Sequence, residues 1–342
     1  MTRAFSRVSI SALTFAIALT AHAQYFVKNL VSDGFTPAVT IDPNLVNPWG
    51  VAFGPTGPFW IANNGPSNST LYNSAGMPFP LGNPLVVSVP PTDSAPTGLV
   101  FNGGTGFKIT KNGVTGPSVF IFVTEGGQIV GWNPNVDPTN GVVATDESDE
   151  GAIYKGAAIV NNKLYVTNFS EGTVDYYDSN FKELGHFTDA SLPVGYVPFG
   201  IENIGHNLLC VTFALRSGDD DVPGAGHGFV DIFTEGGFLV RHFASRGVLN
   251  SPWGIAVAPS NFGPASNMLL IGNFGDGRIN AFSMSGQSMG PLLNEKNNVI
   301  THHGLWALKF GNGGAAGPTN HLFFTAGSNG ERDGLFGRIR MP

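Results

Sequence analysis

The stretch N-P-W-G-V-A-F at residues 47–53 returns as S-P-W-G-I-A-V at residues 251–257. In both places a turn rich in small residues and a second apolar run follow. Weaker copies lie between and after these two, and all six align on one small residue: Gly50, Gly98, Gly156, Gly200, Gly254 and Ala307. The intervals of 44 to 58 residues suit four-stranded propeller blades with their loops. The sequence therefore predicts an all-β, six-bladed β-propeller.

Each copy begins with a short apolar strand, expected at residues 50–53, 98–101, 156–159, 200–203, 254–257 and 307–310. The glycines would let these strands crowd round a central axis, where a side chain would collide. The second strands are apolar throughout, as in sheets that are covered on both faces. The last copy has only three strands, so we expect residues 25–31 to supply its fourth and close the ring.

The first residues have the pattern of a secretory signal peptide. Arg3 and Arg7 precede an apolar run at residues 10–20, and Ala21-His22-Ala23 is a small-x-small cleavage site. The run is shorter than the ~20 residues that span a bilayer. The sequence predicts cleavage after Ala23, a single propeller domain at residues 24–342, and a secreted or periplasmic protein.

Composition limits the partners. The formal net charge is −7, charged residues make up only 12% of the chain, and there is no run of Lys or Arg. This balance argues against nucleic acid or an anionic membrane as a partner. The single cysteine, Cys210, excludes an intrachain disulfide and is expected to be a buried strand residue. We expect a monomer.

Several repeats resemble NHL-type six-bladed propellers, notably L-Y-V-T-N-F, E-G-T-V-D-Y-Y and G-N-F-G-D-G-R-I-N-A-F. More narrowly, D-D-V-P-G-A-G-H-G-F-V-D-I-F at residues 220–233 and G-L-F-G-R-I at residues 334–339 look like an uncharacterised family of secreted bacterial propellers. Some members of that family carry a C-terminal PEP-CTERM sorting tag, which this chain does not show. The resemblance implies the fold and export from a bacterium, and it implies no substrate.

Loops that lead into the first strands, and loops that join second to third strands, should converge at one mouth of the channel. Asn63, Asn168 and Asn273 occupy matching places in three copies. With Glu125 or Asp220 they could bind Ca²⁺, which takes six to eight oxygen ligands, as in the lactonase site of gluconolactonase-type propellers. The alternative is turn chemistry, because Asn is common in turns that need a positive φ.

Histidines offer a second possibility. His227, His302 and His303 fall on loops assigned to the same mouth, where they could bind Zn²⁺ or act as a general base. No HxH or HExxH spacing supports them. Glu125 is a further catalytic candidate.

The connection at residues 216–228, R-S-G-D-D-D-V-P-G-A-G-H-G, is far longer than an ordinary hairpin loop. It should fold over the channel mouth. The candidate ligand-binding residues are therefore Arg216, Asp219, Asp220 and Asp221, together with Lys155, Glu331 and Arg332. Trp49, Trp253 and Trp306 recur at the start of a blade, and we expect them to pack between blades rather than to bind sugar.

Two functions remain open. The chain could be a binding scaffold that presents one mouth to a small molecule, a glycan or a protein. This first function is favoured because no compact catalytic motif is present. The alternative is a metal-assisted hydrolase, lactonase or lyase that uses Ca²⁺ or Zn²⁺ at the same mouth. The fold alone does not choose between them.

Overall fold

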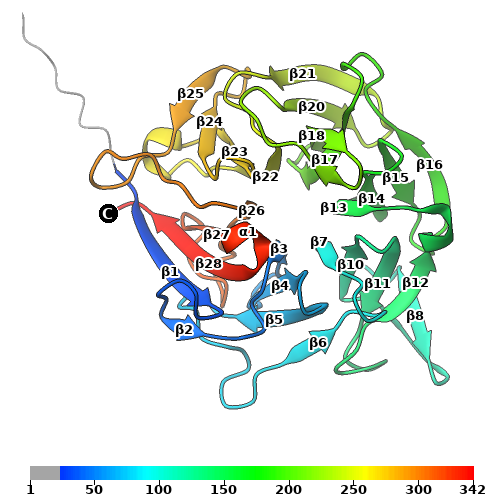
Figure 1. Ribbon diagram of the computed structural model, residues 1–342. Helices are drawn as coiled ribbons and strands as arrows, with labels where there is room; N and C mark the ends of the chain where they lie inside the picture. The colour runs from blue at the N-terminus through cyan, green and yellow to red at the C-terminus, as the bar shows by residue number, and fades with distance from the viewer. Residues whose placement is uncertain (1–23) are drawn as a thin grey trace, which may run out of the picture.

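The computed structural model describes residues 24–342, and the predicted signal peptide lies outside the described residues. Six sheets stand round a central axis, as in a β-propeller, and all are antiparallel except for one short parallel pair at the rim (Figure 1). Within the described residues, no helix is both long enough and apolar enough to cross a membrane. The fold predicted from the repeats is confirmed.

In each blade the first strand named lies at the axis and the last lies at the rim. Blade 1 contains β3 (Pro48–Ala52), β4 (Phe59–Asn63), β5 (Asn68–Tyr72) and β6 (Val86–Ser88). Blade 2 contains β7 (Pro96–Phe101), β10 (Phe120–Thr124), β11 (Gln128–Trp132) and β12 (Val142–Asp146). Blade 3 contains β13 (Tyr154–Val160), β14 (Lys163–Asn168), β15 (Thr173–Tyr177) and β16 (Glu183–Phe187).

Blade 4 contains β17 (Tyr196–Asn203), β18 (Leu208–Ser217), β20 (Phe229–Thr234) and β21 (Leu239–Ser245), and the short β19 (Asp220–Asp221) pairs with β18. Blade 5 contains β22 (Pro252–Val257), β23 (Leu269–Asn273), β24 (Ile279–Phe282) and β25 (Ser288–Pro291). Blade 6 contains β26 (Leu305–Phe310), β27 (Leu322–Gly327), β28 (Asp333–Arg340) and β1 (Phe26–Ser32), and β2 (Thr40–Ile41) extends it.

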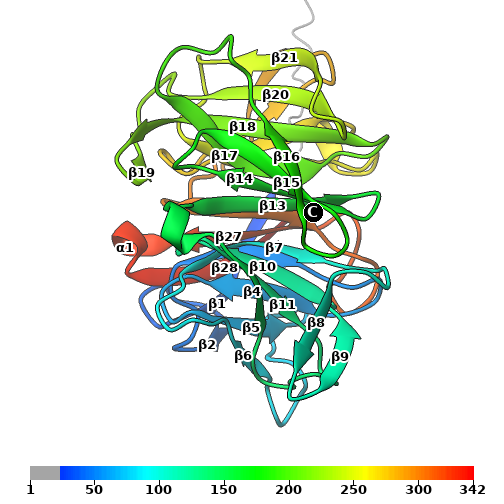
Figure 2. The ribbon, with the colours of Figure 1, turned by 90° about the vertical axis from the view of Figure 1, so that its right-hand side faces the viewer.

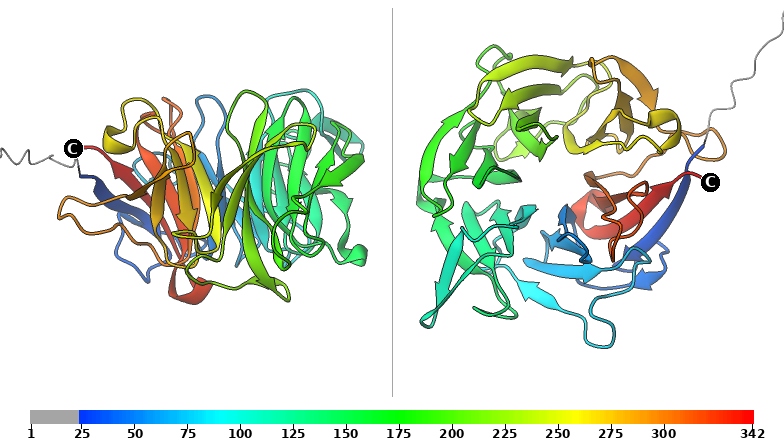
Figure 3. Two further views of the ribbon diagram at one scale, coloured as in Figure 1. Left: turned by 90° about the horizontal axis from the view of Figure 1, so that it is seen from above. Right: turned by 180° about the vertical axis from the view of Figure 1, so that it is seen from behind.

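The N-terminal strand closes the ring, as the sequence predicts. β1 pairs antiparallel with β28, from Phe26 opposite Arg340 to Ser32 opposite Leu335. The two strands lie side by side at the rim in front and back views (Figures 1 and 3). Blade 6 is therefore built from both ends of the chain.

Three details differ from the sequence prediction. The inner strands begin earlier than expected, so the P-W-G residues lie inside β3 and β22. A hairpin of β8 (Lys108–Lys111) and β9 (Val114–Pro117) is inserted between β7 and β10. One helical turn, α1 (Ser328–Glu331), joins β27 to β28, and 3-10 turns occur at Ser148–Glu150 and Gly263–Ala265.

The inner strands touch backbone to backbone at the axial glycines. A Cβ built on Gly200 would stand 2.2 Å from the carbonyl oxygen of Trp253, and one on Gly254 would stand 2.4 Å from that of Trp306. Real Cβ atoms do not approach so closely, so these positions need glycine. The expected crowding at the axis is confirmed. Cys210 lies fully buried in β18, and burial raises the pKa of its thiol.

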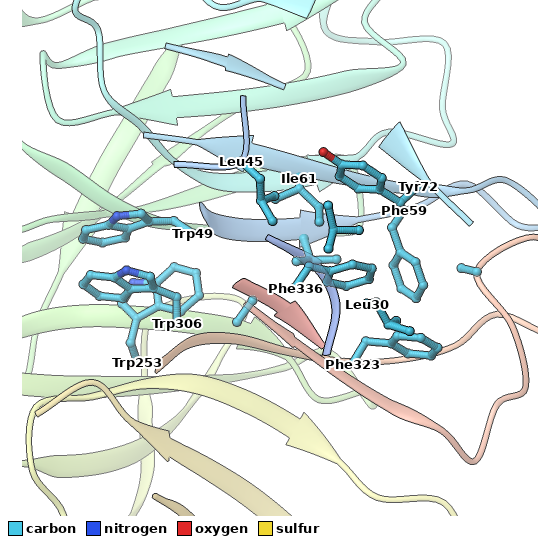
Figure 4. Close-up of a cluster of buried hydrophobic side chains, with 14 of the residues drawn as sticks. Leu30, Leu45, Trp49, Phe59, Ile61, Tyr72, Trp253, Trp306, Phe323 and Phe336 are labelled. Carbon is cyan, nitrogen blue, oxygen red and sulfur yellow. The ribbon is translucent and has the colours of Figure 1, made fainter. Parts of the chain in front are cut away.

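The tryptophans of the repeat pack between blades, as expected, and their contacts lie at the axis. The rings of Trp49 and Trp306 stack with centroids 3.4 Å apart, and Trp253 meets both edge-on. Phe199, which holds the same place in blade 4, joins them at 6.0 Å from Trp306. Figure 4 shows the three indoles together, beside the apolar core of blades 1 and 6. The rings converge because each comes from the residue just before an axial small residue.

Candidate functional site

The front mouth is the end of the channel at which the chain enters the six inner strands, and it faces the viewer in Figure 1. β19 and α1 project from this same face of the ring (Figure 2). The side chains described next come from strands and loops of all six blades. They stand over the tryptophans of the repeat.

Lys155 in β13 is the central cation of the front mouth. Its side chain is only 3% exposed, and its ammonium pairs with the Glu125 carboxylate at the end of β10. The ammonium also lies 3.8 Å from Asp220 Oδ1. Its distances to the ring centroids of Trp49 and Phe169 are 5.4 and 5.3 Å, within cation–π range. One buried charge is therefore held by carboxylates and by aromatic rings.

A chain of hydrogen bonds continues from this ion pair across blades 2, 1 and 6. Glu125 Oε2 accepts a hydrogen bond of 2.7 Å from Asn64 Nδ2. Asn47 Nδ2 donates to Asn64 Oδ1 at 3.2 Å and to Glu331 Oε2 at 2.9 Å. Asn47 Oδ1 accepts from Trp306 Nε1 at 3.0 Å. The aromatic floor and the carboxylates are thus fixed in one network.

Local backbone geometry aims two members of the network. Asn47 has φ 45° just before β3, and Glu331 has φ 67° at the end of the α1 turn. Left-handed backbone is easier for Asn than for most residues and is uncommon for Glu. Strained residues of this kind persist where the surrounding contacts hold them. In Glu331, the Asn47 amide supplies such a contact.

Two carboxyl groups of the front mouth have raised pKa values. Burial raises the pKa of Glu331, and the Asn47 hydrogen bond works in the opposite direction. Burial likewise raises the pKa of Asp221, against the lowering effects of Ser251 and Lys155. Carboxyl groups shifted toward neutral pH are frequent at functional sites.

Several buried polar atoms at this mouth have no hydrogen-bond partner among residues 24–342, and they include Trp49 Nε1, Asp221 Oδ2, Ser251 Oγ, Asn63 Oδ1 and Asn273 Oδ1. Ser251 stands close enough to Asp221 to affect its pKa, but neither oxygen has a partner in hydrogen-bond geometry. Most buried polar side-chain atoms are paired, so a cluster of unpaired atoms calls for an explanation.

The insertion between β18 and β20 folds back on its own strand. β19 pairs with the end of β18, which brings Asp220 and Asp221 to the front mouth, while Asp219 is exposed. Arg216 donates to the carbonyl oxygens of Phe169 and Ser170 on blade 3. Arg332 is exposed beside α1. The structure therefore brings Lys155, Asp220, Asp221 and Glu331 together, and it uses Arg216 to anchor the insertion.

The three asparagines proposed as metal ligands bond within their own surroundings. Asn63 Nδ2 donates to Asn68 and Thr70 in the next strand. Asn168 Nδ2 donates to Asp175 at 2.8 Å. Asn273 Nδ2 donates to the Val248 carbonyl and to Asp276. Each amide thus has a local structural role.

The candidate histidines contact separate segments. His227 Nδ1 lies 2.9 Å from the Val222 carbonyl oxygen and stabilises the insertion. His302 stacks on Phe324 with ring centroids 3.9 Å apart, while His303 is exposed. Burial, and to a lesser extent the charge of His303, lower the pKa of His302 to about 4. His302 is thus neutral at physiological pH.

The opposite, back mouth holds a second polar contact that the sequence did not reveal. Lys309 on β26 pairs with Glu202 on β17 at 2.9 Å, across the channel. Hollows of about 280 and 290 Å³ flank this pair. Away from both mouths, Asp189, Asp231 and His242 form the one group of His, Cys, Asp or Glu in residues 24–342 with three mutually close ligand atoms. No pattern singled out these residues in advance.

Relatives in curated collections give the chain a family but no activity. An uncharacterised protein of Acanthamoeba polyphaga mimivirus is 36% identical over 329 residues, which cover 92% of this chain and 79% of the viral protein. A second uncharacterised mimivirus protein is 32% identical over a match that covers 93% of this chain and 86% of the viral protein. This chain belongs to their family. No family model matches it. Because these members are viral, they give no support to the bacterial source that the resemblance implied.

Solved structures similar to this family member share its fold. Virginiamycin B lyase from Staphylococcus aureus matches 93% of this chain and all of its own, with a TM-score of 0.52 and 13% identity. A luciferin-regenerating enzyme matches 92% of this chain and 95% of its own, with a TM-score of 0.55 and 10% identity. A candidate gluconolactonase matches 94% of this chain and 93% of its own, with a TM-score of 0.56 and 12% identity. At these identities the likeness establishes the fold alone.

Proposed function

We propose that this protein is a ligand-binding β-propeller that captures a small polar compound at its front mouth. The main support is a set of unpaired buried atoms, Trp49 Nε1, Asp221 Oδ2 and Ser251 Oγ, beside the stacked tryptophans at the axis. Leaving such an atom unpaired costs about 1–3 kcal/mol. A ligand that pairs these atoms would remove that cost. The neighbouring carboxylates and Lys155 are already fixed by hydrogen bonds, which lowers the entropy lost on binding.

The charges of the mouth indicate the chemistry of the ligand. Glu125, Asp221 and Glu331 offer carboxyl groups against the single ammonium of Lys155. Hydroxyl or amine groups are the natural partners of carboxylate oxygens, and Trp49 offers an indole N–H to an acceptor. These features favour a sugar, another polyol or an amine over an anion.

A ligand screen tests this proposal. Melting temperature would be measured with a panel of sugars, polyols and amines, and each compound that stabilises the protein would be titrated by calorimetry. Asp221→Asn and Glu331→Gln should weaken binding of such a compound at least tenfold. Glu202→Gln at the back mouth is the matched control and should bind normally. Equal binding by all variants, or no stabilising compound, would count against the proposal.

A second candidate is an enzyme at the same mouth, a hydrolase, lactonase or lyase. It is favoured by the raised pKa values of Glu331 and Asp221, which burial causes and the Lys155 ammonium partly offsets, since a carboxyl group shifted toward neutral pH is suited to proton transfer. Turnover of a lactone or ester that is lost in Glu331→Gln, but kept in Glu202→Gln, would support it. No turnover across the panel would leave the binding function as the better account.

The metal-assisted form of that enzyme needs Ca²⁺ or Zn²⁺ at the mouth. Its ligands would be Asn63, Asn168 and Asn273 with Glu125 or Asp220, or the histidines His227, His302 and His303. Such an ion would bind the amide oxygens, which have no hydrogen-bond partner among residues 24–342 in Asn63 and Asn273, whereas Asn168 Oδ1 already accepts from Ser170. Activity that is abolished by EDTA and restored by one of these ions is the result this form requires.

Export is also part of the proposal. It rests on the basic, apolar and small-x-small pattern at residues 1–23. Expression of the full chain, followed by N-terminal sequencing of secreted protein, should show cleavage after Ala23. Retention of an uncleaved chain inside the cell would contradict it.

A further inference from the structure

Asp189, Asp231 and His242 meet on the outer part of blade 4, away from both mouths. Asp231 on β20 stands directly opposite His242 on the neighbouring strand β21. Asp189 comes from the segment between β16 and β17, which links blade 3 to blade 4. His242 Nδ1 lies 3.1 Å from Asp231 Oδ1 and 3.2 Å from Asp189 Oδ2. Three segments of the chain therefore converge on one point.

The two carboxyl groups are almost completely buried. The side chains of Asp231 and Asp189 are 1% and 4% exposed, whereas that of His242 is 50% exposed. Asp189 Oδ1 is occupied by the backbone N–H and hydroxyl of Ser191. Asp231 Oδ2 is buried and has no hydrogen-bond partner among residues 24–342, and buried Asp189 Oδ2 has only the ion-pair contact with His242 Nδ1 at 3.2 Å. Buried acids that repel each other are costly unless a cation or a proton lies between them.

Blade 3 provides an internal comparison. Its third and fourth strands place Asp175 opposite His186, the same cross-strand pair with the same spacing in sequence. There the Asp175 carboxylate accepts hydrogen bonds from Asn168 and Thr173, which satisfy it. In blade 4 the corresponding carboxylate keeps a free oxygen and gains a second acid, Asp189. The repeat alone therefore does not explain the arrangement in blade 4.

We propose that Asp189, Asp231 and His242 bind a divalent transition-metal ion that ties the link from blade 3 to the outer strands of blade 4. His242 Nδ1 lies 3.1 and 3.2 Å from the two carboxylates, which are spacings that a shared ion at ~2.0–2.2 Å from each ligand atom can satisfy. One imidazole and two carboxylates suit Zn²⁺ or Mn²⁺ rather than Ca²⁺, which prefers oxygen ligands alone. The exposed side of His242 leaves room for water to complete the coordination.

Calorimetric titration of metal-free protein with Zn²⁺ and with Mn²⁺ tests this site. The full mature chain should bind one ion that Asp231→Asn and His242→Gln each lose, with affinity at least tenfold weaker. Zn²⁺ should raise the melting temperature of the natural protein and fail to do so in His242→Gln. Asp189→Asn should behave as Asp231→Asn does.

His186→Gln is the matched control, because it removes the equivalent histidine of blade 3. It should keep the ion and the increase in melting temperature. His242 is half-exposed and Asp231→Asn preserves shape, so all variants should fold, which circular dichroism checks. The assignment is overturned if His242→Gln retains the same stoichiometry and thermal shift as the natural protein. Tighter binding of Ca²⁺ than of Zn²⁺ at these residues would also overturn it.

Discussion

Lys155 holds in blade 3 the position that Trp49 holds in blade 1, and its ammonium lies 5.4 Å from the centroid of that indole. Both residues stand immediately before the axial glycine of their blade. A lysine at this place puts a charge among aromatic rings, where a cation–π contact and the Glu125 carboxylate stabilise it. At this repeat position, a lysine in place of an aromatic residue therefore adds a charged group to the aromatic cluster at the axis.

Replacement of Lys155 by Met should lower the free energy of unfolding at pH 7 by about 3 kcal/mol, because it removes the ammonium that balances the charge of Glu125 and leaves only the Asn64 hydrogen bond. The double variant Lys155→Met with Glu125→Gln should recover part of this loss. Urea unfolding of the natural protein and both variants measures the effect. Lys163→Met, on the same blade, is the control and should change little; a loss as large as that of Lys155→Met would contradict the buried ion pair.

Gly254→Ala should destabilise the ring by about 3 kcal/mol or prevent folding, because its Cβ would stand 2.4 Å from the Trp306 carbonyl oxygen. Thermal unfolding and soluble yield measure the effect. Gly57→Ala is the matched control, since its nearest neighbour would be 3.6 Å away. Normal stability of Gly254→Ala would show that the inner strands can move apart.

Acid should destabilise the protein partly through His302. Its pKa of about 4 in the folded chain lies below the ordinary value of 6.5, so folding favours the neutral ring. The contribution is fully present above about pH 6.5 and is lost as the pH falls toward 4, by up to about 3 kcal/mol. His302→Phe keeps the stack on Phe324 and should flatten this part of the pH dependence. Urea unfolding at pH 7, 5.5 and 4.5 measures how the free energy of unfolding falls with pH, and this fall should be smaller in His302→Phe than in the natural protein.

Removal of residues 1–32 should open the ring, because β28 loses the strand that covers its edge. The shortened chain should melt at a lower temperature and self-associate through the free edge. Removal of residues 1–23 alone is the control and should leave β1 in place. Melting curves and size-exclusion chromatography distinguish the two, and identical behaviour would mean that β1 does not close the ring.

The sequence predicted the blades and their closure because both depend on a periodic signal. Six small residues set the register, and counting strands in the last copy left one vacancy that residues 25–31 could fill. It did not predict the β8–β9 hairpin, although Asn112-Gly113 at its turn is a strong hairpin signal. The flanking strands are too short and too polar to stand out from a loop.

The candidate site was only partly predictable. Loops named from the repeat do bring Glu125, Lys155, Asp220 and Glu331 to one mouth. The hydrogen bonds among them depend on rotamers that no spacing encodes. The pairing of Asp231 with His242 could have been found, because the same spacing recurs at Asp175 and His186. The position of Asp189 beside this pair could not have been predicted, since links between blades have no fixed length.

Closure by β1 also constrains the order in which the protein can be completed. β1 is synthesised before the other strands of the six blades, and its partner β28 is synthesised after them. At roughly 5–20 residues per second, the wait between them is on the order of tens of seconds. During that time the edge of β1 has no strand to pair with on that side. Blade 6 can therefore form only after the other five blades have been made.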